Sequence, residues 1–150
     1  MVRILITLVI YLTSVIGHAQ LNKSKMTSSD KEGVLKVIVE INGIGSDNGM
    51  VYFAIYNSES NFSNKKPVNG GNVKVEGGKV KITFDHLKPG IYAVTCYHDA
   101  NNNGKMDFET NGMPLEDYGA TNNVMNYGPP RFNDAKFELK DKDLTFEIKF

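Results

Sequence analysis

Apolar side chains recur at every second position along several short stretches of this 150-residue chain. The stretch from 35 to 41 alternates apolar and polar side chains, and so does the stretch from 79 to 85. Side chains of a β-strand point alternately to its two faces, so this period indicates strands with one buried face. No stretch shows a convincing helical period. Short strands separated by Gly- and Asn-rich turns therefore predict an all-β sandwich.

The same signals place the remaining strands and turns. Gly77-Gly78 predicts a hairpin turn. Residues 57–71 are rich in Ser, Asn and Gly, and we expect a loop there with Phe62 as its apolar anchor. Residues 108–133 show no clear periodicity. Further strands are expected at 50–56, 73–75 and 91–98 and, as a terminal hairpin, at 135–139 and 144–150, which makes about seven strands in total.

The segment before the strand at 91–98 sharpens the expected fold. Residues 87–92, Leu-Lys-Pro-Gly-Ile-Tyr, are similar to the tyrosine corner of Greek-key, immunoglobulin-like sandwiches. In that corner the tyrosine hydroxyl donates a hydrogen bond to the backbone just upstream, so Tyr92 is expected to be structural. Counting by twos from Tyr92 places Cys96 on the same face, where it would be a small buried apolar residue and not a nucleophile.

The first nineteen residues have the composition of a signal peptide. Arg3 supplies a positive charge, an almost wholly apolar run extends from Ile4 to Ile16, and Gly17 and Ala19 are small residues at the positions that a signal peptidase reads. The run is shorter than the roughly twenty residues needed to span a bilayer, so a retained membrane anchor is the less favoured alternative. We expect export to the periplasm, the medium or the cell surface, with no membrane span in the mature chain.

The chain after this cleavage point, from Gln20, is organised as one domain. Residues 20–33 carry almost nothing that could be buried and predict a flexible tether, and residues 34–150 predict the β-sandwich domain. Removing residues 1–19 takes away one of the 17 basic residues and none of the 17 acidic ones, which gives 16 − 17 = −1. With no basic surplus, a nucleic-acid partner is not expected. Cys96 is the single cysteine, so no intramolecular disulfide can form.

Residues 99–107, which we name the Asp/Asn loop, place oxygen-bearing side chains at alternating positions around a glycine. Calcium takes about six to eight oxygen ligands, and a short loop of this pattern supplies several of them. With Asp99 as the first position, the spacing predicts a calcium site with an affinity on the order of 10⁻⁴–10⁻³ M. The predicted ligands are Asp99, Asn101, Asn103, the backbone carbonyl of Lys105, and Asp107.

The Asp/Asn loop departs from an EF-hand, because its twelfth position is Thr110 and a strand precedes it. A further carboxylate could come from Glu109, Glu116 or Asp117, and the sequence does not choose among them. The alternative is a metal-free turn in which the Asp and Asn side chains bond their own backbone.

Catalytic constellations are not apparent in the sequence. The predicted mature chain has two histidines, His86 and His98, which are expected at opposite ends of neighbouring strands. There is no Gly-x-Ser-x-Gly elbow, phosphate-binding loop or His-Glu-x-x-His motif. The acidic residues could in principle form a catalytic pair, but calcium binding explains them more economically. A hydrolase is therefore the least favoured function.

Four blocks of sequence carry a resemblance to a known family. They are LKPGIYAV at 87–94, HDANNNGKMD at 98–107, GMPLEDYG at 112–119 and GPPRFNDA at 128–135. In order and spacing they resemble an exported bacterial family known as domain of unknown function 2141. The resemblance implies an exported prealbumin-like sandwich, similar to modules found on surface proteins and beside peptidase domains, and it implies no activity.

These observations lead us to expect a secreted, non-catalytic β-sandwich in which calcium rigidifies one end. The irregular segment 108–133 is the candidate recognition surface, for an extracytoplasmic protein or a glycan. The alternative is a carbohydrate-binding or adhesion module with a metal-free loop. Four residues of the types that dominate recognition surfaces lie there, although they could instead cap the sandwich: Tyr118, Tyr127, Arg131 and Phe132.

Overall fold

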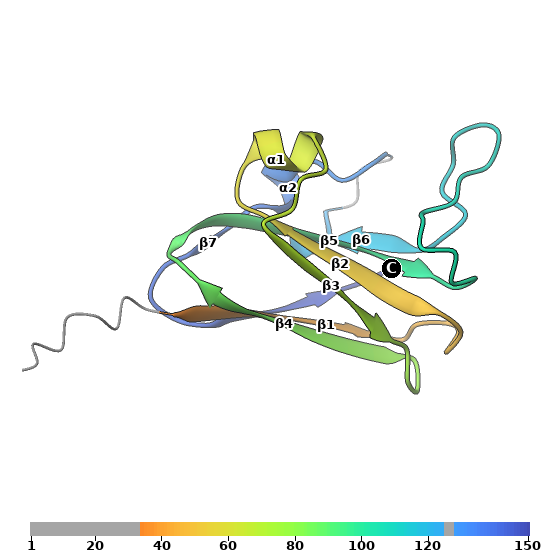
Figure 1. The fold of residues 1–150 in the computed structure, drawn as a ribbon, viewed down its shortest axis with the longest axis horizontal. Helices are drawn as coiled ribbons and strands as arrows, with labels where there is room; N and C mark the ends of the chain where they lie inside the picture. The colour runs from red at the N-terminus through yellow and green to blue at the C-terminus, as the bar shows by residue number, and fades with distance from the viewer. Residues whose placement is uncertain (1–33, 125–127) are drawn as a thin grey trace, which may run out of the picture. The chain divides into compact units, whose positions relative to one another are not determined.

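The computed structural model describes residues 34–124 and 128–150, all within the unit Lys31–Phe150 (Figure 1). The predicted signal peptide and tether lie outside the described residues. The elements are β1 (Leu35–Asn42), β2 (Met50–Tyr56), α1 (Glu59–Ser63), β3 (Asn69–Lys74), β4 (Lys79–Leu87), β5 (Gly90–Asp99), β6 (Tyr118–Ala120), η1 (Thr121–Asn123), α2 (Phe132–Ala135), β7 (Phe137–Leu139) and β8 (Leu144–Ile148).

The described strands form two sheets that pack face to face. The first sheet has the order β4-β1-β8, and the second has the order β3-β2-β5-β6, with β7 also paired to β5. The predicted all-β sandwich is therefore confirmed, with eight strands where about seven were expected. The additional strand is β6, which lies inside the segment that shows no periodicity in the sequence.

The core lies between the sheets and follows the predicted alternation. Val37, Val39 and Ile41 of β1 are buried, as are Val51 and the other inward residues of β2 and β5. Burying one such side chain stabilises the fold by about 1.5–3 kcal/mol. Cys96 belongs to this core, and burial raises the pKa of its thiol far above the usual range. Its predicted role as a small buried residue is confirmed.

Two predicted turns are also confirmed. The Tyr92 hydroxyl donates to the Lys88 carbonyl oxygen at 3.0 Å, which is the tyrosine corner. Gly77 and Gly78 connect β3 to β4 with φ of 60° and 69°, a conformation that favours glycine. The Asp47 carboxylate accepts both of their backbone N–H groups, at 3.0 and 2.7 Å.

The predicted terminal hairpin is wrong. β7 pairs antiparallel with β5, whereas β8 pairs parallel with β1, so the two strands belong to different sheets. Residues 140–143 cross from one sheet to the other. The alternation within each strand is the same in both arrangements, because Leu139 and Ile148 face the common core from opposite sheets. The alternation of apolar and polar residues therefore could not show which strands pair with β7 and β8.

The stretch 57–71 is only partly a loop, and the expectation of no helices is wrong for two short ones. The Ser58 hydroxyl oxygen accepts the Asn61 N–H at 3.2 Å and begins α1. One-turn helices are too short to show a period of 3.6 residues. Phe62 is the anchor as predicted, because its ring packs on Tyr56 and Phe132 at 5.0 and 5.8 Å between ring centroids. Through these contacts α1 and α2 cover the outer face of the second sheet (Figure 1).

Candidate metal-binding site

Asp99, the last residue of β5, organises the Asp/Asn loop. Its side chain is fully buried, and its two carboxylate oxygens accept the N–H groups of Asn103 at 3.1 Å and Gly104 at 2.7 Å. Gly104 has φ of 75°, so glycine suits the bend. A Cβ on Gly49 would lie 1.9 Å from the Asp99 carbonyl oxygen, so glycine is also required where the connection before β2 passes this residue.

The two asparagines of the loop bond both to the backbone and to Asp107. The Asn101 side-chain oxygen accepts the Asn103 N–H at 3.0 Å, and the Asn103 side-chain oxygen accepts the Lys105 N–H at 2.8 Å. The amide groups of Asn101 and Asn103 both donate to Asp107 Oδ2, at 2.8 and 2.6 Å. The structure thus joins the four predicted side-chain ligands, Asp99, Asn101, Asn103 and Asp107, in one hydrogen-bonded network.

A hairpin, residues 107–116, follows the loop and returns the chain to it. Leu115 N–H donates to the Asp107 carbonyl oxygen at 2.9 Å, and Glu109 N–H donates to the Met113 carbonyl oxygen at 2.8 Å. Figure 1 shows this hairpin projecting beyond the end of β5. Its closure brings residue 116 back to residue 107, nine positions earlier.

Glu116 is the carboxylate that the hairpin adds to the Asp/Asn loop. Its Oε2 accepts the Asp107 N–H at 3.1 Å, whereas its Oε1 is shielded from solvent and has no hydrogen-bond partner among the described residues. Burial raises the pKa of Glu116, and the negative charges of Asp99 and Asp107 raise it further. A buried carboxylate oxygen without a donor is costly unless a cation or water satisfies it.

The other two candidate carboxylates have different surroundings. Glu109 accepts the Asn111 amide at 3.0 Å near the hairpin tip. The Asp117 side chain is exposed, and the Asp117 backbone carbonyl oxygen accepts the backbone N–H of His98 at 2.9 Å. Among the three, Glu116 is the one that bonds to a residue of the Asp/Asn loop. This choice depends on the register of the hairpin, for which the sequence offers no signal.

The donor set of the loop consists of hard oxygen atoms, which suit calcium better than zinc or copper. Within the described residues, no three His, Cys, Asp or Glu side chains are grouped closely enough to hold a metal ion by themselves. Backbone N–H groups and Asn amides occupy the space between the carboxylates. A calcium ion would therefore require the Asn101 and Asn103 amides to turn oxygen atoms toward it in place of N–H groups.

The histidines are separated by the fold. His98 is buried in β5, with Nε2 2.6 Å from the Asn48 carbonyl oxygen, to which it donates as the Nε2–H tautomer. His86 is exposed in β4, which belongs to the first sheet. The described structure therefore does not bring the two imidazoles to one site.

Three tyrosines lie opposite one another on neighbouring strands beside the Asp/Asn loop. Tyr52 of β2 pairs with Tyr97 of β5, which pairs with Tyr118 of β6, and all three are half-buried. The Tyr52 and Tyr97 rings stack with centroids 5.2 Å apart. Burial raises the pKa of Tyr97, and the charge of Asp99 adds to the shift.

A second polar feature was not predicted from the sequence. It consists of the residues of η1, Thr121–Asn123, and we name it the polar clamp. Thr121 is buried beside Val94 of β5, which lies between the β5 residues that pair with β6 (95–97) and those that pair with β7 (90–92). Its hydroxyl accepts the Val94 N–H at 3.1 Å and donates to the Ala135 carbonyl oxygen at 2.5 Å. One side chain thus supplies partners for backbone groups that no neighbouring strand reaches.

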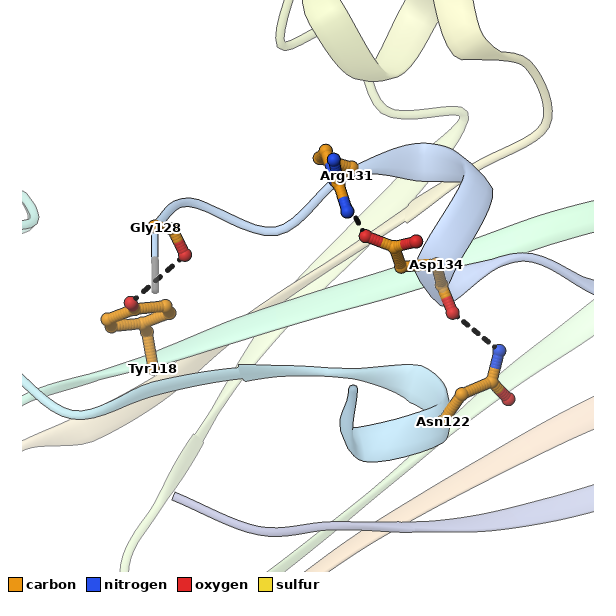
Figure 2. A network of polar contacts seen from close by, with 5 residues as sticks. All are labelled: Tyr118, Asn122, Gly128, Arg131 and Asp134. Carbon is orange, nitrogen blue, oxygen red and sulfur yellow. Dashed lines mark hydrogen bonds and ion pairs between the residues drawn. The ribbon is translucent and has the colours of Figure 1, made fainter. Parts of the chain in front are cut away.

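The asparagines of the polar clamp bond to two further segments. Asn122 donates to the carbonyl oxygens of Asp134 at 2.9 Å and Lys136 at 3.0 Å; Figure 2 shows the first of these bonds. The Asn123 amide donates to the Glu147 carbonyl oxygen at 2.8 Å and accepts the Lys149 N–H at 2.9 Å, as a neighbouring strand would. Both asparagines have positive φ, 71° and 51°. Asparagine tolerates this region better than most residues, and that preference was the available sequence signal.

The four predicted recognition residues have different positions. Phe132 is buried among Tyr56 and Ala135 and packs α2 onto the second sheet, which agrees with the capping alternative and not with a place on a recognition surface. Arg131 is exposed and pairs with Asp134 at 2.7 Å, and the Tyr118 hydroxyl lies 3.4 Å from the Gly128 carbonyl oxygen (Figure 2). Tyr127 lies outside the described residues.

Comparison with known proteins identifies one family. The chain matches, over residues 39–147, a family described as an uncharacterised protein conserved in bacteria (DUF2141). No curated protein and no solved structure matches the chain. Among the described residues, no helix has the length and apolar character needed to cross a membrane.

Proposed function

We propose that this chain, which belongs to the DUF2141 family, is an exported, non-catalytic β-sandwich module whose Asp/Asn loop binds one structural calcium ion. The ion would join three parts of the chain: the end of β5, the bend at Gly104 and the base of the hairpin 107–116. Its role is to hold the hairpin in a fixed position on the sandwich.

The observation that carries this proposal is the environment of Glu116. Its Oε1 is buried and has no hydrogen-bond partner in the part of the chain that the structure describes, and its charge lies near those of Asp99 and Asp107. Three carboxylates without a cation repel one another, which destabilises the folded state. A divalent cation removes the repulsion and supplies the missing partner. Calcium is the divalent cation best suited to a mixed set of carboxylate, amide and backbone oxygens.

The ligands we propose are those predicted from the sequence, completed by Glu116. The Asp99 oxygens and Glu116 Oε2 each accept one N–H group and retain a second lone pair for a cation, whereas the Asn101 and Asn103 amides would turn their oxygen atoms toward it. The existing hydrogen bonds from Asn103 and Gly104 N–H to Asp99 hold that carboxylate in place before an ion arrives. The ligand set is Asp99, Asn101, Asn103, the carbonyl of Lys105, Asp107 and Glu116.

The absence of catalysis is part of the proposal and is supported by the positions of the reactive residue types. Cys96 is buried and its thiol pKa is raised, so it holds its proton at neutral pH. His86 and His98 lie in different sheets, and the Nε2 of His98 is bonded to a backbone carbonyl. A nucleophile held by a base and a third group is not assembled from these residues.

Export is supported by the composition of residues 1–19. A site with an affinity on the order of 10⁻⁴–10⁻³ M is filled outside the cell, where calcium is abundant. Amino-terminal sequencing of protein recovered from the periplasm or medium tests this part of the proposal. We expect Gln20 as the first residue, and an N-terminus upstream of it would contradict the predicted processing.

Calorimetric melting tests the calcium proposal. Calcium that binds only the folded state at ten to a hundred times its Kd stabilises the protein by about 1.4–2.7 kcal/mol and raises Tm by roughly 5–10 °C. We expect this shift with calcium, a smaller one with magnesium and none with chelator. Glu116→Gln should reduce the calcium shift, and the matched variant Asp117→Asn should retain it. An unchanged Tm at about 10 mM calcium, ten times the upper end of the expected Kd, would leave a metal-free turn.

The tyrosine row supports a second candidate, a glycan-binding surface. Tyr52, Tyr97 and Tyr118 lie in register beside the Asp/Asn loop, and aromatic rings with a polar end are common in recognition surfaces. A cello-oligosaccharide and a chito-oligosaccharide serve as probes in titration calorimetry. Binding that is lost in Tyr97→Ala and kept in Tyr92→Phe would favour this candidate, and no heat with either probe would count against it.

A further inference from the structure

Five asparagines of the chain are each followed directly by glycine, a pair of residues that can modify itself. In this reaction the backbone nitrogen of the glycine attacks Cγ of the asparagine side chain and displaces its amide group. Glycine favours the attack because no side chain hinders the approach or restricts the backbone. The five pairs lie within the described residues: Asn42-Gly43, Asn48-Gly49, Asn69-Gly70, Asn103-Gly104 and Asn111-Gly112.

The pair Asn69-Gly70 has the attacking nitrogen beside its target. These residues begin β3, at the edge of the second sheet, and both are exposed. The Gly70 N–H donates to the side-chain oxygen of Asn69 at 2.8 Å, and this is the one hydrogen bond of the Asn69 side chain among the described residues. Rotation about the side-chain bonds of Asn69 turns Cγ toward that nitrogen. Groups held together in this way react faster than groups that must first meet.

The Asp/Asn loop holds its own Asn-Gly pair in an unreactive arrangement. The Asn103 side-chain oxygen accepts the Lys105 N–H, its amide donates to Asp107, and the Gly104 N–H donates to Asp99. A carboxylate next to the Gly104 nitrogen opposes the loss of its proton, because one negative charge would form beside another. The attack should therefore be slow at Asn103.

The surroundings of the other three pairs also oppose the reaction. The Asn42 amide donates to Glu147 at 3.2 Å, and the Asn111 amide donates to the Glu109 side chain at 3.0 Å. The glycine N–H that follows Asn111 donates to the Glu109 carbonyl oxygen at 2.9 Å. Gly49 is packed against the backbone at the end of β5, where a Cβ would lie 1.9 Å from a carbonyl oxygen. Only the pair in β3 directs the glycine N–H at the preceding asparagine side chain.

We propose that Asn69 is a self-modification site, at which the Gly70 nitrogen displaces the side-chain amide group as ammonia. The nitrogen gives its proton to hydroxide and forms a bond to Cγ. The bond from Cγ to the amide nitrogen then breaks, and the leaving group takes a proton from water. One water molecule opens the resulting succinimide ring at either carbonyl carbon. The product is aspartate or isoaspartate, and no atom is oxidised or reduced.

The two products change the edge of the second sheet in different ways. Aspartate adds a negative charge at the start of β3. Isoaspartate adds the same charge and also lengthens the main chain, which then runs through the side-chain carbon atoms. The longer chain does not fit the register in which Asn69 lies opposite Ile55 and Gly70 lies opposite Ala54. The proposal does not require the calcium site to be occupied.

Peptide mapping by mass spectrometry tests the proposal on the folded protein during incubation at mildly alkaline pH. All five pairs are followed in the same molecule through the mass increase that replacement of the amide by a carboxyl group produces. We expect Asn69 to react about fivefold or more faster than each of the other four asparagines. Asn69→Gln should abolish the reaction there, because the longer side chain must close a larger ring. The matched variant Asn72→Gln changes another asparagine of β3, which valine follows, and should leave the rate at Asn69 unchanged.

The same incubation in urea separates the effect of the fold from that of the local sequence. Unfolding removes the contacts that distinguish the five pairs, so their rates should become similar. Circular dichroism in buffer establishes that the unchanged protein and each variant are folded. A folded protein in which Asn69 is not the first of the five to react overturns the proposal, as does the same order and spread of rates in urea.

Discussion

The Asp/Asn loop and the polar clamp use the same chemistry in opposite ways. In both regions, side-chain oxygens and amides form hydrogen bonds with backbone groups that the described strands and helices leave without a partner. Within the loop and from Glu116, these bonds join residues two to nine positions apart. In the polar clamp they join residues 12 to 27 positions apart and connect β5, α2 and β8. The loop therefore shapes one segment, whereas the clamp holds distant segments together.

The two regions also differ in charge. The Asp/Asn loop, with Glu116, gathers three carboxylates and leaves one buried oxygen without a partner among residues 34–124 and 128–150. The polar clamp contains no ionisable side chain, and its side-chain groups have partners within the fold. Stability contributed by the loop should therefore depend on cations and pH, and stability contributed by the clamp should not. The predictions below test this difference.

The largest effect is expected for Asp99→Ala. This substitution removes a buried acceptor from two backbone N–H groups and should destabilise the fold by about 3 kcal/mol, because each such charge-assisted bond contributes about 1.5–3 kcal/mol. It should also abolish the effect of calcium on Tm. Denaturant unfolding in calcium and in chelator measures both. A variant that retains the full calcium shift would show that Asp99 is not a ligand.

Thr121→Val should be the next most harmful change. The valine keeps the shape of the side chain but leaves the Val94 N–H and the Ala135 carbonyl without their buried partner, which costs about 2 kcal/mol. Thr121→Ser retains the hydroxyl and serves as the control. The loss should be equal in calcium and in chelator. A loss that calcium reverses would mean that the clamp and the loop are coupled.

Asn123→Gly should cost about 1 kcal/mol, again independently of calcium. Glycine accepts the positive φ of this position, so the change reports the loss of the two bonds to Glu147 and Lys149 and not backbone strain. Chemical denaturation at matched ionic strength gives the value. An unchanged free energy of unfolding in Asn123→Gly would mean that water replaces the amide. The stabilising residues of the polar clamp would then be Thr121 and Asn122.

Glu116→Gln should show a smaller effect whose sign depends on calcium. Burial and the charges of Asp99 and Asp107 raise the pKa of Glu116 in the metal-free fold. A raised carboxyl pKa means that this group's contribution to stability falls as pH rises from its unfolded pKa through its folded pKa. At neutral pH in chelator, the glutamine variant should therefore melt at or above the unchanged protein. In calcium it should melt below it, because a charged ligand is lost.

Much of the fold was predictable because its strands bury one face each. β1 and β4 alternate apolar and polar side chains as a half-buried strand does, and β2 and β5 are runs rich in β-branched and aromatic residues. β6, with three residues, is too short for a period to appear, whereas β7 lies within the predicted strand 135–139. The partner of β8 was mistaken because pairing is a non-local property, and Leu139 and Ile148 are buried equally well from either sheet.

The candidate metal-binding site was also predictable only in part. The network from Asp99 to Asp107 could be anticipated because its bonds span at most six positions. Glu116 could be named only as one of three candidates, since the hairpin register selects it. The preference of asparagine for positive φ was not enough to predict the polar clamp, because a Thr-Asn-Asn sequence is also ordinary in loops and the partners of the clamp are distant along the chain.

Titration of calcium into the purified protein, followed by isothermal calorimetry, tests the central claim most directly. The account predicts one calcium ion per chain, with a Kd on the order of 10⁻⁴–10⁻³ M, weaker binding to Glu116→Gln and unchanged binding to Asn123→Gly. Absence of binding when calcium is raised to about 10 mM, ten times the upper end of this Kd, would contradict the account, as would equal binding by the Glu116→Gln variant.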